Sequence, residues 1–185
     1  MRNTDITSIY NNHINDLYSY ALHLGFDEDI IMDAIHDVFL NMCKTDKKIK
    51  EITNIKFFLF RSLKNRLLNL SRNKERIVDF PINPDLEKLP FDIHVTIDEL
   101  LITKEEHEIT RQKIEEMLNL LTPRQREIIY LRYAQEYDYE QIAQLMNISV
   151  PACRKLVHRA LTIIREKYPI PLFFLFLEMM KMLKN

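Results

Sequence analysis

The 185-residue sequence contains a single glycine, Gly25, and this scarcity constrains the fold more than any other feature. Glycine supplies the left-handed or closely approached backbone that hairpin turns and phosphate-binding loops require. One glycine therefore argues against P-loops, dinucleotide-binding fingerprints and most hairpin-rich folds. Because 46% of the residues are hydrophobic and 29% are charged, the chain can still bury a core. We predict an all-α protein.

Three segments of the first 76 residues show apolar residues at helical spacing. The first segment ends at Leu24, and Gly25 follows where a left-handed C-cap is expected. The second begins after the acidic residues 27–29 and carries a buried stripe between residues 30 and 42. The third, roughly 54–73, has an apolar face and a polar stripe at steps of three and four. That stripe consists of Arg61, Asn65, Asn69 and Arg72.

A break in this periodicity divides the chain. From residue 77 to about 98 the pattern fails, and three prolines disfavour a helix. Fully extended, these 22 residues would reach about 70 Å. We therefore expect two small helical lobes, 1–76 and 99–168, joined by a flexible linker, 77–98. For the apolar C-terminal extension, 169–185, we expect a packed helix; the alternative is a regulatory or membrane-touching segment.

The second lobe contains a helix-turn-helix pattern between Tyr139 and Leu156. Capping sequences begin at Thr122, Asp138 and Ser149, and each is followed by a new apolar helical pattern. Asn147 stands at the turn, where it tolerates a positive φ. The second helix of the pattern would present a basic face to DNA. Its outward residues are Ser149, Ala152, Arg154, Lys155, His158 and Arg159. The alternative is a helical hairpin in a bundle with a basic exposed face.

Charge is segregated along the chain, although the formal net charge is only -1. Residues 56–76 contain seven basic and one acidic side chain, and residues 122–185 contain ten and six. The stretch between them, 77–121, contains four basic and eleven acidic side chains. Two basic blocks indicate two surfaces for a polyanion, with the acidic segments left for another partner. The alternative is a pair of solvated helix faces.

The cysteine pattern favours a cytoplasmic protein without disulfides. Cys43 and Cys153 are far apart, and no N-terminal export signal precedes them. Paired zinc-ligand spacing is not visible, so we expect no metal, cofactor or small-molecule substrate. The apolar tail is interrupted by charged residues within about ten positions and is too short to span a bilayer.

Several motifs resemble those of bacterial extracytoplasmic-function (ECF) sigma factors of the sigma-70 family. Residues 33–40 (DAIHDVFL), 58–65 (FLFRSLKN) and 69–72 (NLSR) are similar to that family's region 2. Residues 121–127 (LTPRQRE), 131–133 (LRY), 139–143 (YEQIA) and 159–160 (RA) are similar to its region 4. The resemblance implies a region 2 helical bundle and a region 4 helix-turn-helix. It also implies a factor that binds core RNA polymerase and directs promoter recognition and melting.

The resemblance further implies the roles of individual residues. Polymerase docking would use Asp33, His36, Asp37, Phe39, Leu40 and Asn41 on the second helix. The melted -10 element would be held by Phe58, Lys64, Asn65, Asn69 and Arg72, with Arg61 on the same basic stripe. The outward residues of the helix-turn-helix would read the -35 element. The partners implied are core RNA polymerase, promoter DNA and a dedicated anti-sigma factor.

Two other functions remain at this point. A stand-alone helix-turn-helix regulator would bind duplex DNA without polymerase, but would not need a polar stripe on the third helix. A metal-dependent phosphohydrolase would use Asp33, His36 and Asp37, which lie within about one helical turn, but matching His and Asp pairs elsewhere are not visible. We therefore expect a protein that is not an enzyme.

Overall fold

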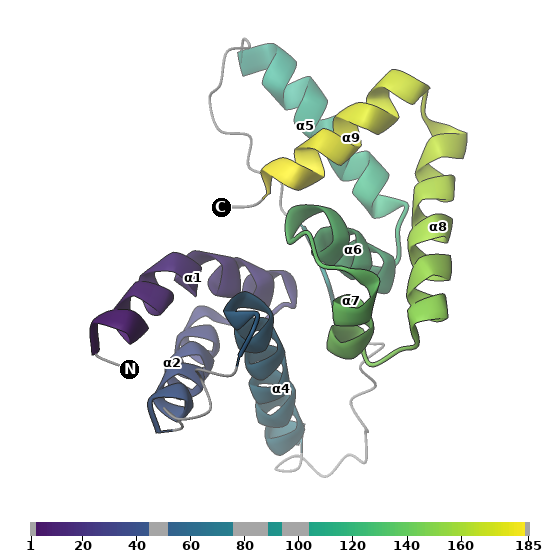
Figure 1. The fold of residues 1–185 in the computed structure, drawn as a ribbon. Coiled ribbons are helices and arrows are strands. Elements are labelled where there is room, and N and C mark those ends of the chain that lie inside the picture. The colour runs from purple at the N-terminus through teal and green to yellow at the C-terminus, as the bar shows by residue number, and fades with distance from the viewer. Residues whose placement is uncertain (1–2, 45–51, 76–88, 94–103, 184–185) are drawn as a thin grey trace. The chain divides into compact units, whose positions relative to one another are not determined.

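The computed structural model describes residues 3–44, 52–75, 89–93 and 104–183. The chain divides into two compact units, Met1–Pro90 and Phe91–Asn185. Throughout the described ranges the regular secondary structure is helical (Figure 1). The prediction of an all-α chain folded into two helical lobes is therefore confirmed.

The first unit is built from α1 (Asn3–His23), α2 (Glu28–Lys44) and α4 (Ile55–Glu75), which pack pairwise against one another. Its core contains large side chains with essentially no exposed surface. They include Leu17, Tyr20, Ile31, Ile35, Phe60, Leu63 and Leu67. The apolar stripes expected on all three helices therefore meet in one core.

Gly25 ends α1 in the way that its place in the sequence predicts. Its φ of +80° is the left-handed conformation that glycine adopts without steric cost. Its amide donates to the Leu22 carbonyl at 2.9 Å, which closes the turn. A Cβ at this position would lie 2.9 Å from Cγ of Pro90, so both backbone conformation and space select glycine here.

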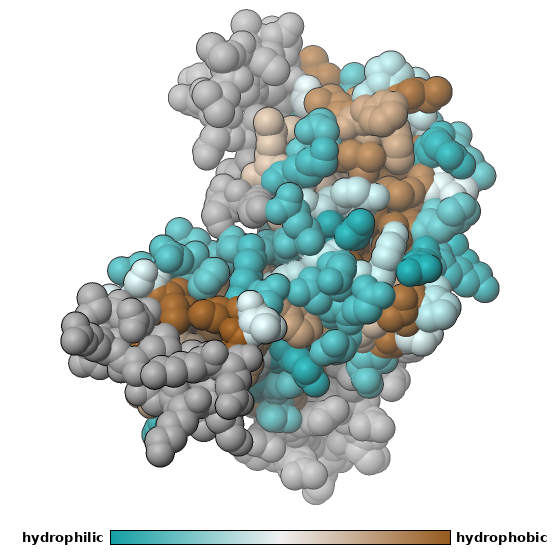
Figure 2. All heavy atoms as spheres, in the orientation of Figure 1, coloured by the Kyte–Doolittle hydropathy of each residue, from teal (hydrophilic) through white to brown (hydrophobic). Residues whose placement is uncertain are grey.

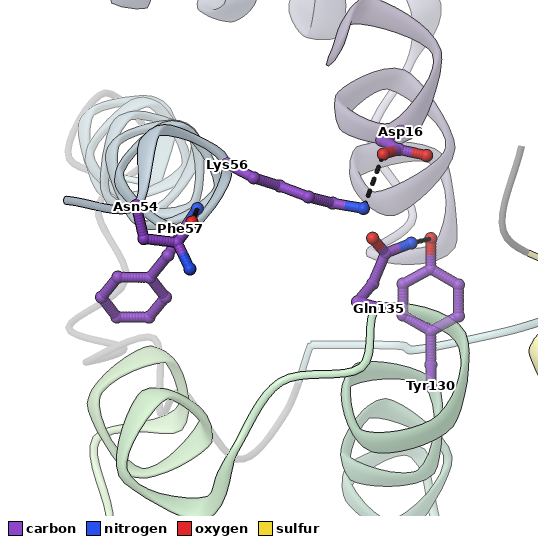
Figure 3. A network of polar contacts seen from close by, with 6 residues as sticks. All are labelled: Asp16, Asn54, Lys56, Phe57, Tyr130 and Gln135. Carbon is purple, nitrogen blue, oxygen red and sulfur yellow. Dashed lines mark hydrogen bonds and ion pairs between the residues drawn. The ribbon is translucent and has the colours of Figure 1, made fainter. Parts of the chain in front are cut away.

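An ion pair joins α1 to α4 inside the first unit (Figure 3). Lys56 Nζ lies 2.7 Å from Asp16 Oδ2, and Asp16 is only 8% exposed. The same ammonium lies 5.8 Å from the ring centroid of Phe60. Burial, assisted by the charge of Lys56, lowers the pKa of nearby His13 against the opposing effect of Asp16. The start of α4 is capped by Asn54, whose Oδ1 accepts from the Phe57 amide at 2.9 Å.

The second unit contains α5 (Lys104–Asn119), α6 (Pro123–Ile129), the π-helix η1 (Tyr130–Ala134), α7 (Tyr139–Met146), α8 (Val150–Lys167) and α9 (Ile170–Met182). Thr122 and Gln125 form the expected capping box at the start of α6. The π-helical turn was not predicted. Gln135, which caps the end of η1, donates from its side-chain amide nitrogen to the Tyr130 hydroxyl at 2.8 Å in a buried position (Figure 3).

Helix α9 corresponds to the apolar C-terminal extension. Phe176, Met179 and Met180 are buried on one face, and the helix contacts η1 and α8. Its other face leaves Ile170 65% and Phe174 59% exposed, and apolar side chains reach the surface near the junction of α8 and α9 (Figure 2). No helix among the described residues combines the length and apolar character that a membrane span requires.

A short described segment lies inside the expected linker. Phe91 and Ile93 are 2% and 3% exposed, and the Phe91 ring centroid lies 5.6 Å from that of Tyr130. Asp92 Oδ1 also forms an ion pair with Arg126 Nη1 at 2.6 Å. Residues 91–93 therefore pack as part of the second unit. Most of the expected linker lies outside the described residues.

Candidate functional site

The helix-turn-helix in the second unit has the local geometry that its sequence predicts. Asp138 Oδ1 accepts from the Gln141 amide at 2.7 Å, and Gln141 Oε1 accepts from the Asp138 amide at 3.0 Å. Asn147 adopts φ +52° and ψ +51° at the turn. Ser149 then caps α8, since its hydroxyl accepts from the Ala152 amide at 3.3 Å. The two caps define where α7 and α8 begin, and the left-handed Asn147 defines where α7 ends.

The inner face of α8 is apolar. Cys153, Val157, Ala160 and Ile164 are buried, and α8 contacts both α6 and α7. Burial raises the pKa of the Cys153 thiol, with Arg124 acting weakly in the opposite direction. The buried thiol therefore stays protonated near neutral pH and contributes to packing.

The outer face of α8 carries the whole set predicted for the -35 element. All six side chains are exposed: Ser149, Ala152, Arg154, Lys155, His158 and Arg159. Arg154, Lys155 and Arg159 are basic and extend from the first three turns of the helix. This face can neutralise phosphates and present hydrogen-bond donors to base edges.

Arg154 also contacts the first residue of the preceding helix. Its guanidinium carbon lies 5.4 Å from the ring centroid of Tyr139, and that of Arg132 lies 5.0 Å from the same centroid. Arg132 Nη1 donates to the Tyr137 carbonyl at 2.8 Å. The sequence reasoning did not assign a role to Tyr139 or Arg132. The signal available was an aromatic residue at a helix start in a basic segment.

On α4 the polar stripe is partly realised. Arg61, Asn65 and Asn69 are exposed and form one row at steps of four, while Phe58 is half-buried. The side chain of Arg72 lies outside the described residues. The exposed row brings a guanidinium and two carboxamides together on one helix face.

The expectation that Lys64 lies on this surface differs from its position in the structure. Lys64 is 4% exposed, because it belongs to the row that includes buried Phe60 and Leu68. Residues four apart share a helix face, so the spacing that places Asn65 outside places Lys64 inside. In this structure Lys64 is therefore buried, unlike the exposed row beside it.

On α2 the predicted docking residues separate into exposed and buried groups. Asp33, His36, Leu40 and Asn41 are exposed, with Leu40 at 56%. Phe39 is only 6% exposed, and its ring meets Tyr10 edge-on with 4.9 Å between centroids. Since this position packs α2 against α1, a direct docking role for Phe39 does not fit the structure.

Asp37 makes an ion pair within the first unit. Its Oδ2 accepts a hydrogen bond from Arg66 Nε at 2.8 Å, which links α2 to α4. Both side chains remain about 40% exposed, so the pair is strongly screened by solvent. Arg66 was not among the predicted site residues. The neighbouring His36 ring is nearly parallel to that of Tyr10, with an interplanar angle of 15° and 6.5 Å between centroids.

The phosphohydrolase hypothesis obtains no support from the arrangement of these residues. In the part of the chain that the structure describes, no three His, Cys, Asp or Glu side chains gather into a possible metal site. Asp37, one of the three proposed ligands, faces the guanidinium of Arg66 instead.

An exposed basic helix in a well-capped helix-turn-helix, together with a separate helical lobe, defines the class as a two-lobed DNA-binding protein. Two family models match the chain. Residues 9–77 match sigma-70 region 2, and residues 111–164 match sigma-70 region 4. Together they cover well over half of the sequence in the family's order. The chain therefore belongs to the sigma-70 family of bacterial transcription initiation factors, and it is an ECF sigma factor.

A solved structure supports the fold. The sigma factor RpoE from Bartonella quintana, crystallised in complex with the anti-sigma factor NepR, is 23% identical to this chain. The match covers 88% of this chain and 95% of that one, with a TM-score of 0.58. No curated protein sequence matches the chain significantly.

Family membership decides between the functions left open by the sequence. Sigma-70 factors bind core RNA polymerase and promoter DNA, and the family initiates transcription without being enzymes. The stand-alone helix-turn-helix regulator is not favoured, because region 2 accompanies region 4 in this chain.

Proposed function

We propose that the two lobes of this sigma factor divide a promoter between them. The exposed face of α8 contacts the -35 element as duplex DNA, and the exposed row on α4 contacts the melted -10 strand. The observation that carries this proposal is the row Arg61, Asn65 and Asn69. A factor that reads duplex DNA alone has no need for it.

The residues of the α4 row suit single-stranded DNA. Carboxamides can hydrogen-bond the edges of unpaired bases, and the guanidinium of Arg61 can neutralise a phosphate. Phe58 is half-buried, so part of its ring remains available for stacking against a base. We include Arg72 from its sequence position and leave out Lys64, which is 4% exposed.

The face of α8 suits duplex DNA. Its cations can hold phosphates while its N-terminal residues, Ser149 and Ala152, approach the bases of a major groove. Arg154 and Lys155 would reach base edges or phosphates, and Arg159 would contact the backbone. His158 lies on the same exposed face.

We assign polymerase docking to the exposed side of α2. Asp33 supplies negative charge, Leu40 supplies apolar area, and His36 and Asn41 supply polar edges. Asp37 contributes through its carboxylate, which remains 39% exposed beside Arg66. Such a half-acidic, half-apolar face is complementary to a basic helix of the polymerase.

The remaining assignments follow from the same role. We infer that the factor acts in the cytoplasm without enzymatic activity, and that its lobes, 1–76 and 99–168, are joined through 77–98. We also infer an anti-sigma partner for this chain. The support is that RpoE from Bartonella quintana was crystallised with one.

The test is reconstitution with core RNA polymerase on genomic DNA, followed by sequencing of the transcript starts. Wild-type protein should produce specific starts, while Asn65→Ala should bind core enzyme normally but reduce strand opening, measured by permanganate reactivity of thymines. Asn12→Ala, an exposed asparagine on α1, is the matched control and should behave as wild type. Absence of specific starts, or normal opening by Asn65→Ala, would contradict the proposal.

A further inference from the structure

Two arginines approach the ring of Tyr139 at the start of the helix-turn-helix. Tyr139 is the first residue of α7, and its ring is approached by Arg132 from η1 and by Arg154 from α8. The guanidinium carbons lie 5.0 Å and 5.4 Å from the ring centroid, inside the range of cation–π attraction. We infer that Tyr139 is a positioning residue, which holds Arg154 in the orientation that reads the -35 element. This inference rests on the proposed function.

The ring is attached to the body of the unit through Arg132. Arg132 Nη1 donates to the Tyr137 carbonyl at 2.8 Å, and Tyr137 is 3% exposed. The chain of contacts therefore runs from a buried backbone segment through Arg132 and the Tyr139 ring to Arg154. Arg154 is otherwise an exposed side chain on the outside of α8.

The contact has a consequence for DNA binding. A guanidinium held over an aromatic ring can still offer N–H groups for hydrogen bonds. Its rotamer freedom is reduced before DNA arrives, so less conformational entropy is lost on binding. A lysine at the same position would offer neither a planar fork nor a stacking face.

The contacts also set an upper limit on the distance between two positive charges. Because both guanidinium carbons lie within 5.4 Å of one centroid, their separation is at most about one Debye length at 0.1 M salt. This repulsion opposes the attraction of each cation for the ring. Approach of an acceptor or phosphate relieves it, so the arrangement is better suited to holding DNA than to stabilising the free protein.

The experiment compares base preference in the -35 element, position by position. The template pool is built from one promoter that the wild-type factor uses, with its -35 element randomised. Holoenzyme formed from the full chain and core polymerase transcribes this pool. The variants are Arg154→Ala, Tyr139→Leu, Tyr139→Phe and the double variant of Arg154→Ala with Tyr139→Leu. Tyr168→Leu, a half-buried tyrosine at the end of α8, controls for loss of an aromatic ring.

We expect Tyr139→Leu to reduce preference about two- to tenfold at the same positions that Arg154→Ala affects. Tyr139→Phe should retain the preference because it keeps the ring, and the double variant should be no worse than Arg154→Ala alone. Tyr168→Leu should leave the preference unchanged. Thermal unfolding followed by circular dichroism separates this local effect from loss of the fold.

Three results would overturn the positioning role. Tyr139→Leu could leave the preference intact while Arg154→Ala alters it, or Arg154→Ala could itself have no effect. Tyr139→Leu could also weaken all positions equally, together with a lower melting temperature. By contrast, a wild-type holoenzyme without specific starts would refute the proposed function, and the positioning role with it.

Discussion

Phe39 and Leu40 are neighbours on α2 with opposite environments, so truncating each one separates packing from docking. Phe39 is 6% exposed and packs against Tyr10, whereas Leu40 is 56% exposed. Phe39→Ala should lower the free energy of unfolding by about 3–5 kcal/mol, the range for buried phenylalanines. Leu40→Ala should change it by less than about 0.5 kcal/mol, as exposed substitutions do.

For polymerase affinity the order should be reversed: Leu40→Ala should weaken binding directly, whereas Phe39→Ala should not. Burying a leucine completely is worth about 1.5–3 kcal/mol, and roughly half of the Leu40 side chain is still available to be buried. Docking on this face should therefore gain about 1 kcal/mol from Leu40, and Leu40→Ala should raise Kd about fivefold. Phe39→Ala should reduce binding only to the extent that the lobe unfolds.

The assay uses the full chain in both measurements. Urea unfolding followed by circular dichroism gives stability, and titration of N-terminally labelled protein with core polymerase gives Kd. Leu22→Ala on α1, where the leucine is 45% exposed, is the matched control for Leu40→Ala. Wild-type affinity of Leu40→Ala would refute docking through this face. Weakened affinity of a fully stable Phe39→Ala would refute the buried assignment of Phe39.

Three further perturbations test the structure. Gly25→Ala should lower the free energy of unfolding by about 1–2 kcal/mol because of the left-handed backbone, and further because the new Cβ would lie too close to Pro90. An unchanged urea midpoint would contradict this. Burial and Lys56 lower the pKa of His13, so as the pH falls this imidazole is protonated in the unfolded chain before it is protonated in the folded one. The free energy of unfolding should therefore fall as the pH drops below about 6.5. Urea titrations at several pH values should show a weaker pH dependence for His13→Gln, and an identical dependence would exclude His13 as its source. Asp138→Ala removes the N-cap of α7 and should cost about 0.5–2 kcal/mol, measured as a lower thermal midpoint, and an unaltered midpoint would show that the capping box contributes little.

Local features of the fold could be predicted from the sequence in detail. The caps at Thr122, Asp138 and Ser149, and the positive φ of Gly25 and Asn147, all appear in the structure. Each involves atoms only a few residues apart, so the chemistry of the segment itself determines the conformation. The exposed face of α8 was predicted equally well, because its helical register follows from the buried residues on the opposite side.

Two residues with implied binding roles are buried in the structure, and the environment of each depends on another helix. The resemblance implied a DNA-binding role for Lys64, yet its spacing from Phe60 and Leu68 places it in a buried row. That spacing was visible in the sequence and was outweighed by the resemblance to the family's region 2. The spacing of apolar residues placed Phe39 in the buried stripe of the second helix, whereas the resemblance implied a docking role for it. The structure shows Phe39 buried, and the packing of α1 on α2 identifies Tyr10 as its neighbour.

By itself, then, the sequence determined the helical class, the helix ends and the family, because these depend on propensity, capping and local motif order. Tertiary structure decided which side chains remain available to a partner. Asp37 pairs with Arg66 between α2 and α4, and the guanidinium of Arg154 on α8 lies over the ring of Tyr139 on α7. These contacts join residues 29 and 15 positions apart on different helices, and periodicity within one helix carries no information about its neighbours.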